Sequence, residues 1–283
     1  MTVKIDVNEK AGDSRLADFI AKHRPLFVLT GAGCSTASGI PDYRDENGEW
    51  KHRRPVQFQD FLEVELTRKR YWARSMLGWP LIKNAKPSTA HHALKTLEEA
   101  GLIHHIVTQN VDSLHRKAGS SRVLDLHGNL ETVSCLSCDH QLQRSTLQLY
   151  LHEANPLFNQ RFNEFAPDGD VILETMDISD FKLIPCPRCD GILKPDVVFF
   201  GQSVPKEIVA QAMQYLHSAN GMLVLGSSLM VYSGYRFCLA AIAADKAICA
   251  LNRGRTRADD ELTLKIDEDC GVALDSVTKQ LGV

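Results

Sequence analysis

The sequence predicts an α/β fold: a doubly wound, Rossmann-like parallel sheet with a second, smaller zinc-binding domain. Two observations carry this prediction. Short apolar runs alternate with helix-like stretches through much of the chain, which is typical of a parallel sheet covered by helices on both faces. Two Cys-x-x-Cys pairs, Cys135/Cys138 and Cys186/Cys189, have the spacing of zinc ligands and lie where this alternation breaks.

The first half of the chain shows the alternation most clearly. Apolar residues recur at helical spacing over 14–23, and the apolar run 26–29 that follows indicates a buried strand. Ser88 is positioned to cap the start of a second helix, and Gly101 is positioned to end it. A strand is expected directly afterwards, at 103–108. Further strands are predicted at 123–126, 197–200, 222–225 and 247–251.

Two segments, 51–86 and 132–193, do not follow the alternation. We therefore expect them to form a small domain, inserted twice into a nucleotide-binding domain made of 1–50, 87–131 and 194–283. The stretch 139–185 is long for a zinc ribbon, so much of it is expected to be an insertion. The cleft between the two domains is the expected active site.

Composition excludes several classes of protein. A chain of 283 residues with 44% hydrophobic and 24% charged residues is typical of a soluble globular protein, and its net charge of -3 offers no general basic surface for nucleic acid. No run approaches the roughly 18 apolar residues of a membrane helix, so no membrane association is expected. The N-terminal residues lack the pattern of a signal or transit peptide, which favours a cytoplasmic location with reduced thiols.

The two cysteine pairs predict a structural zinc site. Each pair aims two thiolates at one point, and four sulfur ligands complete the tetrahedral shell that zinc prefers. No coordination position is then left for water, so catalysis must come from other residues. Four buried cysteines without a metal, or a thioredoxin-like redox pair, are weaker interpretations because two matched pairs occur together.

A glycine-rich turn, Gly31-Ala32-Gly33, follows the first predicted strand. Such a turn lets the backbone approach a pyrophosphate and present amide hydrogens to it. The third glycine of the dinucleotide fingerprint would fall at Thr36, so this is not an ordinary dehydrogenase motif. A tight structural turn is the alternative.

Several polar segments follow predicted strands, where ligands of doubly wound sheets bind. His127 comes after the strand at 123–126 and is the candidate general base, since an imidazole titrates near neutrality. A structural histidine is the alternative there, and a capped helix start is the alternative for Asp112. The remaining candidates for ligand contacts are the loop 39–44, with Arg44 for a phosphate, the segment 108–112, Gly226-Ser227-Ser228, and Asn252.

Taken in order, these motifs resemble the sirtuins, a family of NAD-dependent protein lysine deacylases. The resemblance extends over about residues 26–270. It rests on Gly31-Ala32-Gly33, the segments 39–44 and 108–112, Leu126-His127-Gly128, both cysteine pairs and Gly226-Ser227-Ser228. The segments 71–74, 193–201 and 226–236 look most like class II of the family.

The resemblance implies that NAD binds extended between the domains and is consumed as a co-substrate, while zinc takes no part in the chemistry. Tyr43 stands where many relatives have phenylalanine. Residues expected near NAD are Gly31, Ala32, Gly33, Ile40, Pro41, Asp42, Tyr43, Arg44, Gln109, Asn110, Val111, Asp112, Gly226, Ser227, Ser228, Asn252, Arg253, Gly254 and Cys270.

In the family mechanism the acyl oxygen of a modified lysine attacks the anomeric carbon of the nicotinamide ribose and releases nicotinamide. A histidine base, matched here by His127, then activates the ribose hydroxyls, and the acyl group ends on ADP-ribose. An acyl-lysine peptide is expected to add as a strand along Val197, Val198, Phe199, Phe200 and Gly201.

Tyr71 and Arg74 are similar to a Tyr-x-x-Arg pattern that recognises acidic acyl groups in another sirtuin class, which predicts that they line the acyl tunnel. A surface arginine on a helix is the alternative. Two other functions stay open: a protein mono-ADP-ribosyltransferase, and a zinc module that senses NAD without turnover.

Overall fold

The computed structural model describes residues 12–51, 55–158 and 177–283. Its larger sheet has six strands, in the order β3-β2-β1-β7-β8-β9, and every neighbouring pair is parallel. The doubly wound prediction is therefore confirmed. The strands are β1 (Leu26–Thr30), β2 (Ile103–Thr108), β3 (Val123–Asp125), β7 (Gly221–Leu225), β8 (Ala247–Leu251) and β9 (Leu264–Ile266).

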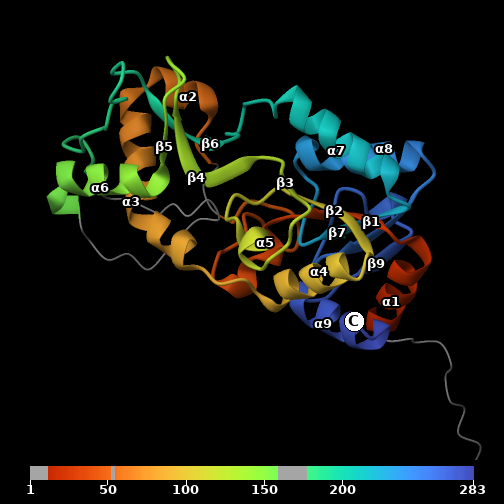
Figure 1. The fold of residues 1–283 in the computed structure, drawn as a ribbon. Coiled ribbons are helices and arrows are strands. Elements are labelled where there is room, and N and C mark those ends of the chain that lie inside the picture. Colours follow the sequence, from red (N-terminus) through yellow and green to blue (C-terminus); the bar gives the residue numbers. More distant parts are fainter. Residues whose placement is uncertain (1–11, 52–54, 159–176) are drawn as a thin grey trace, which may run out of the picture.

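Helices cover both faces of this sheet (Figure 1). On one face lie α1 (Gly12–His23), α4 (Thr89–Glu99) and α9 (Cys270–Leu281), and on the other lie α7 (Lys206–Ser218) and α8 (Tyr232–Ala243). A separate buried apolar cluster fills each face. Both β1 and β7 are buried at every position, so their residues do not alternate between apolar and polar, and Thr30 at the end of β1 is the one polar side chain.

Local sequence signals set the ends of these helices. The Ser88 side chain accepts from the backbone of His91 at the start of α4, and the His91 side chain accepts in turn from the Ser88 N–H, which makes a reciprocal cap. Asp269 caps α9 in a similar way, by accepting from the backbone N–H groups of Gly271 and Val272. Short helices also occur at α5 (Leu114–Lys117), η1 (Ala32–Cys34), η2 (Thr36–Ser38) and η4 (Asp259–Glu261).

A smaller module lies beside the large sheet, at the left of Figure 1. Its three-stranded antiparallel sheet has the order β5-β4-β6, with bounds Gln141–Gln143, Gly128–Cys135 and Leu193–Val197. Its helices are α2 (Phe58–Glu63), α3 (Glu65–Asn84), α6 (Arg144–Ala154) and η3 (Pro156–Phe158). A third apolar cluster, which includes Phe61, Trp72 and Phe181, gives this module a core of its own.

The predicted strand at 197–200 is wrong. The strand in this region is β6, which ends at Val197 and pairs with β4 in the small sheet. The apolar run misled the prediction because its side chains serve different neighbours: Phe199 packs in the core of the small module, whereas Phe200 contacts aromatic rings of the loop after β1. Lys194 Nζ donates to the Val197 carbonyl at 2.5 Å, at the point where the strand ends.

The other predicted strands are found at or within one residue of the expected bounds, but β4, β5 and β9 were not foreseen. Both β4 and β6 cross the boundaries predicted for the small domain, and that division of the chain stays a prediction. Part of it, including the centre of the predicted insertion, falls on residues 1–11, 52–54 and 159–176, outside the described residues. Within the described ranges, no helix has both the length and the apolar character needed to span a membrane.

Candidate active site

The direction of winding reverses between β1 and β7, the two central strands of the large sheet. Ligands of doubly wound sheets bind beyond the carboxyl ends of strands at such a point. Gly31-Ala32-Gly33 follows β1 there, and Gly226-Ser227-Ser228 follows β7. A cavity of about 430 Å³ opens at the same place and is lined by residues of the large sheet and of the small module. This volume is in the range of small-molecule sites.

The glycines of the two turns are required by their close approach to each other. A Cβ at Gly31 would lie 2.7 Å from the Gly226 carbonyl oxygen, and one at Gly33 would lie 2.9 Å from the Gly226 Cα. Gly226 itself has a φ of 57°, in the left-handed region that favours glycine. The packing of one turn against the other is therefore a structural reason for these residues, beside their expected role near a pyrophosphate.

Most of the predicted site residues lie on the wall of this cavity. Those in the lining are Gly31, Ala32, Gly33, Ile40, Asp42, Tyr43, Arg44, Tyr71, Gln109, Asn110, Val111, Asp112, His127, Val197, Val198, Phe199, Phe200, Gly201, Gly226, Ser227, Ser228, Asn252 and Arg253. They come from segments far apart in the sequence, as expected if the motifs serve one ligand.

Of the residues predicted to contact NAD or the substrate, four are not part of the lining: Pro41, Arg74, Gly254 and Cys270. The Cys270 thiol is buried in the apolar core and faces the Leu251 carbonyl oxygen at 3.7 Å. At Gly254 a Cβ would collide with the backbone of Glu46, so this glycine packs against the loop after β1. Arg74 lies on α3, the helix that also carries Tyr71.

Asn110 and Asp112 are fixed by hydrogen bonds to the turn after β1. The Asn110 amide donates to the Gly31 carbonyl at 3.0 Å, and Ser35 Oγ donates to Asp112 Oδ2 at 2.7 Å. Asp112 Oδ1 also accepts from the Leu114 N–H at 2.8 Å, at the start of α5. Asp112 therefore caps a helix start and also lines the cavity. Burial raises the pKa of the Asp112 carboxyl.

Aromatic side chains gather on one side of the cavity. Tyr43 and Trp50, from the loop after β1, both contact Phe200 edge-on, at ring distances of 6.4 and 5.5 Å. The Arg44 guanidinium lies 4.0 Å from the Trp50 ring centre, and its Nη1 donates to the Gly48 carbonyl. The loop expected near NAD is thus joined to the segment expected to dock a peptide.

His127 lies between β3 and β4 with both ring nitrogens hydrogen-bonded. Its Nδ1 is 2.9 Å from the Gln109 carbonyl oxygen, and its Nε2 is 2.8 Å from Ser233 Oγ. Because a carbonyl only accepts, Nδ1 carries the proton and Nε2 is the basic nitrogen. Burial is the main cause that lowers the pKa of His127, so the neutral base predominates at neutral pH.

Several cavity residues were missed by sequence reasoning, and Trp50, Ser233 and Arg236 are among them. Trp50 follows the predicted loop but belongs to no glycine or polar motif. Ser233 and Arg236 lie in the first turns of α8, whose sequence shows only an apolar helix. No local signal indicated that this helix turns its first residues toward His127.

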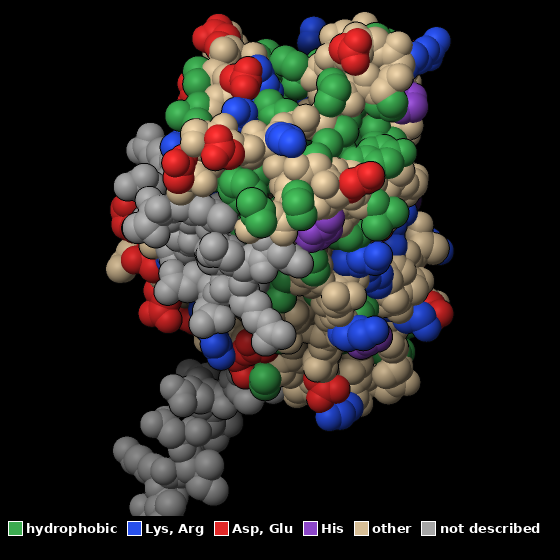
Figure 2. Space-filling view, turned by 90° about the vertical axis from the view of Figure 1, so that its left-hand side faces the viewer, with side chains coloured by type: hydrophobic (Ala, Val, Ile, Leu, Met, Phe, Trp, Pro, Cys, Tyr) green, Lys and Arg blue, Asp and Glu red, His purple; other side chains and the backbone are tan. Residues whose placement is uncertain are grey.

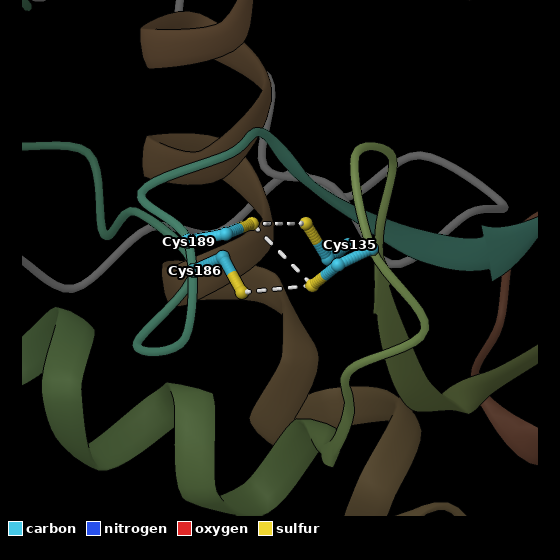
Figure 3. Close-up of side chains that lie close together, drawn as sticks. Cys135, Cys186 and Cys189 are labelled. Atoms are coloured by element: carbon cyan, nitrogen blue, oxygen red, sulfur yellow. Dashed lines mark hydrogen bonds between the residues drawn. The ribbon is translucent and has the colours of Figure 1, made fainter.

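The four cysteines of the two pairs meet in the small module, and all are free thiols (Figure 3). Cys135 and Cys138 lie at the end of β4, and Cys186 and Cys189 lie in the loop before β6. The sulfur atoms of Cys135 and Cys189 lie 3.5 Å apart, those of Cys138 and Cys186 lie 3.8 Å apart, and those of Cys138 and Cys189 lie 3.4 Å apart.

These separations fit a tetrahedral zinc ion, whose four sulfurs at about 2.3 Å from the metal would lie about 3.8 Å apart. They are too long for a disulfide, whose sulfurs lie about 2.05 Å apart. In addition, backbone N–H groups of Ser137 and Arg188 point at the sulfurs of Cys135 and Cys186. Such donors stabilise thiolates, the form that binds zinc.

A model of the Sir2 family matches residues 31–233. The chain belongs to the Sir2 family. It is 53% identical over 267 residues to NAD-dependent protein deacetylase 2 of Bradyrhizobium diazoefficiens, a match that covers 94% of this chain and 98% of that protein. It is also 47% identical over 262 residues to the NAD-dependent protein lipoamidase sirtuin-4, mitochondrial, of Bos taurus, with 92% and 83% covered.

Solved structures of Sir2 proteins have the same fold. Sir2 with a p53 peptide and NAD+ matches with a TM-score of 0.74 at 30% identity, over 95% of this chain and 98% of that one. Sir2Tm bound to a propionylated peptide matches with a TM-score of 0.76 at 30% identity, with the same shares covered. The family assignment made from the motifs is thereby confirmed, whereas the assignment to class II stays a prediction.

Proposed function

We propose that this Sir2-family chain is an NAD-dependent protein lysine deacylase that releases nicotinamide and forms an acyl-ADP-ribose. One observation carries the proposal. A neutral, hydrogen-bonded histidine lines a cavity at the winding reversal of the large sheet, where the family motifs converge. The curated relatives at 52–53% identity are named as NAD-dependent protein deacetylases, which supports the same activity.

We place NAD along the carboxyl ends of β1 and β7. The two glycine turns and Arg44 would contact its phosphates, Gln109 the ribose next to nicotinamide, and Asn252 the other ribose. When bound, NAD supplies a ribose carbon with nicotinamide as its leaving group. Asn110 and Asp112, which are oriented by hydrogen bonds to the turn after β1, would hold the nicotinamide.

The chain itself contributes orientation and proton transfer. His127 can accept a proton at Nε2, because the Gln109 carbonyl holds the other proton on Nδ1. We place the acyl-lysine peptide along 197–201, beside the Val198 N–H that donates to the His127 carbonyl at 2.8 Å. The zinc site would stabilise the small module that carries this edge, without a role in the reaction.

One assay tests the function against its alternatives. A panel of acyl-lysine peptides is incubated with the protein and NAD, and the peptide and nucleotide products are identified by mass spectrometry. The deacylated peptide, nicotinamide and acyl-ADP-ribose are expected together as products. ADP-ribose attached to protein would favour a mono-ADP-ribosyltransferase, and no nicotinamide release with any peptide would leave only an NAD-sensing module.

We further propose that Tyr71 and Arg74 favour acidic acyl groups. Tyr71 is on the cavity wall, and Arg74 is three residues further along the same helix. Replacing Arg74 with alanine is expected to lower kcat/KM for a glutaryl-lysine peptide about tenfold more than for an acetyl-lysine peptide, since only the former loses a carboxylate partner. Equal losses on the two peptides would remove the idea.

The protein substrate, not nucleic acid or membrane, is the proposed partner, and a cytoplasmic location is proposed with it. On the face shown in Figure 2, acidic and basic side chains occur together, so that face offers no uniformly basic surface to a phosphate backbone. All eight cysteines are free, as expected in a reducing compartment.

A further inference from the structure

Ser233 is the group that faces the basic nitrogen of His127. It occupies the second position of α8, and its Oγ lies 2.8 Å from Nε2. Since Nδ1 holds the ring proton for the Gln109 carbonyl, the neutral Nε2 has a lone pair and no hydrogen. The Ser233 hydroxyl is therefore the donor in this contact.

We propose that Ser233 is a positioning residue for the catalytic base, which holds the His127 ring from the side opposite Gln109 and stabilises its neutral form. This inference rests on the proposed role of His127 in deacylation. Two hydrogen bonds at opposite nitrogens fix both the plane of the ring and its tautomer. A ribose hydroxyl that gives its proton to Nε2 would approach the place that the Ser233 hydroxyl holds.

The direction of the electrostatic effect follows from the hydrogen-bond roles. A donor to Nε2 can bind only the neutral ring, so Ser233 favours the base over the imidazolium. Arg236, one turn further along α8, acts in the same direction because its positive charge lowers the pKa of His127. The Arg236 guanidinium stacks on Tyr232 at 4.9 Å and has no ion pair with a carboxylate among the described residues.

The other groups around the imidazole do not provide an opposing charge. Asp125, on β3, directs its carboxylate toward Arg116 and Asn129. After β2, the neutral backbone carbonyl of Gln109 contacts the ring of His127. After β6, the Val198 N–H donates to the backbone carbonyl of His127. Ser233 is thus the neutral donor, and Arg236 the charge, that together keep His127 unprotonated.

The test compares Ser233→Ala, which removes the hydroxyl, with Ser233→Thr, which keeps one. The pKa of His127 is measured in the intact protein by NMR titration of its ring proton, identified by its loss in His127→Ala. Ser233→Ala is expected to raise this pKa, while Ser233→Thr keeps it near that of the wild type. This readout requires no turnover, so it tests the inference even if the proposed function fails.

The pH profile of deacylation provides the second readout. In Ser233→Ala, kcat is expected to fall about threefold to tenfold near pH 6 and much less near pH 8.5, where the base is neutral in either protein. The KM for NAD should change little. Identical titrations and profiles for Ser233→Ala and the wild type, or a Ser233→Thr variant as impaired as Ser233→Ala, would overturn the inference.

Discussion

Replacement of His127 with alanine is expected to lower kcat/KM for an acyl-lysine peptide by about 10² to 10⁴, the range that a general base contributes. The variant loses the basic Nε2 of a cavity-lining residue, and no other histidine is part of the cavity lining described for this chain. The loss should appear in kcat, because the proposed contacts to NAD come from other residues.

The matched control is His92→Ala, which removes an exposed histidine from α4. It should keep the wild-type rate, and NAD affinity measured by calorimetry should be similar in all three proteins. Deacylation at the wild-type rate in His127→Ala would contradict the assignment of the base.

The pH dependence has a defined direction. The base must be neutral to accept a proton, and burial lowers the pKa of His127, so the neutral form extends to lower pH than for a free imidazole. Activity is therefore expected to hold as pH falls through the ordinary range of histidine and to be lost only below it. An acid limb at or above the ordinary histidine pKa would contradict the buried, hydrogen-bonded geometry.

The second large effect is expected at the cysteine cluster. Cys189→Ala removes one of four sulfur ligands at an exposed position, so it disturbs packing little but breaks the tetrahedral site. Binding of zinc at structural sites provides about 10 to 16 kcal/mol in isolated zinc modules, so loss of the metal should unfold or loosen the loops that carry both pairs. Bound zinc, measured by atomic absorption, should fall from one ion per chain to none, and the thermal unfolding midpoint should fall with it.

Arg188→Ala is the control for this variant. Arg188 lies in the same loop and forms an exposed ion pair with Asp139 at 2.5 Å, which is worth at most about 1 kcal/mol. It should retain zinc and unfold near the wild-type temperature. A Cys189→Ala protein with full zinc content would show that the cluster is not the metal site.

The sequence predicted the large sheet well because its signals are local. The strands β2 and β8 were predicted with the observed bounds, and Gly101 and Ser88 correctly marked the ends of α4. The prediction failed at 197–200, where an apolar run follows a strand of the other sheet. Apolar character reports burial but not the partner, so it could not distinguish these two arrangements.

For the candidate site, too, the sequence revealed the residues that have a local signal and missed the others. Motif residues such as Gly31 and Ser227 could be found because each follows a strand that the sequence reveals. Ser233 could not, since a serine near the start of a helix carries no signal of its own. Its relevance arises from the 2.8 Å contact with a histidine 106 positions away.

The sequence by itself determined the fold class and the family, because both depend on short-range spacing and on residue chemistry. The same signals predict the zinc ligands and the catalytic imidazole. Only the tertiary structure decided which nitrogen of His127 carries the proton, that α8 supplies a partner for the other nitrogen, and that Cys270 belongs to the core and not to the cavity. The physical reason is that hydrogen-bond direction and burial are properties of neighbours brought together by folding, and adjacent residues in the chain do not encode them.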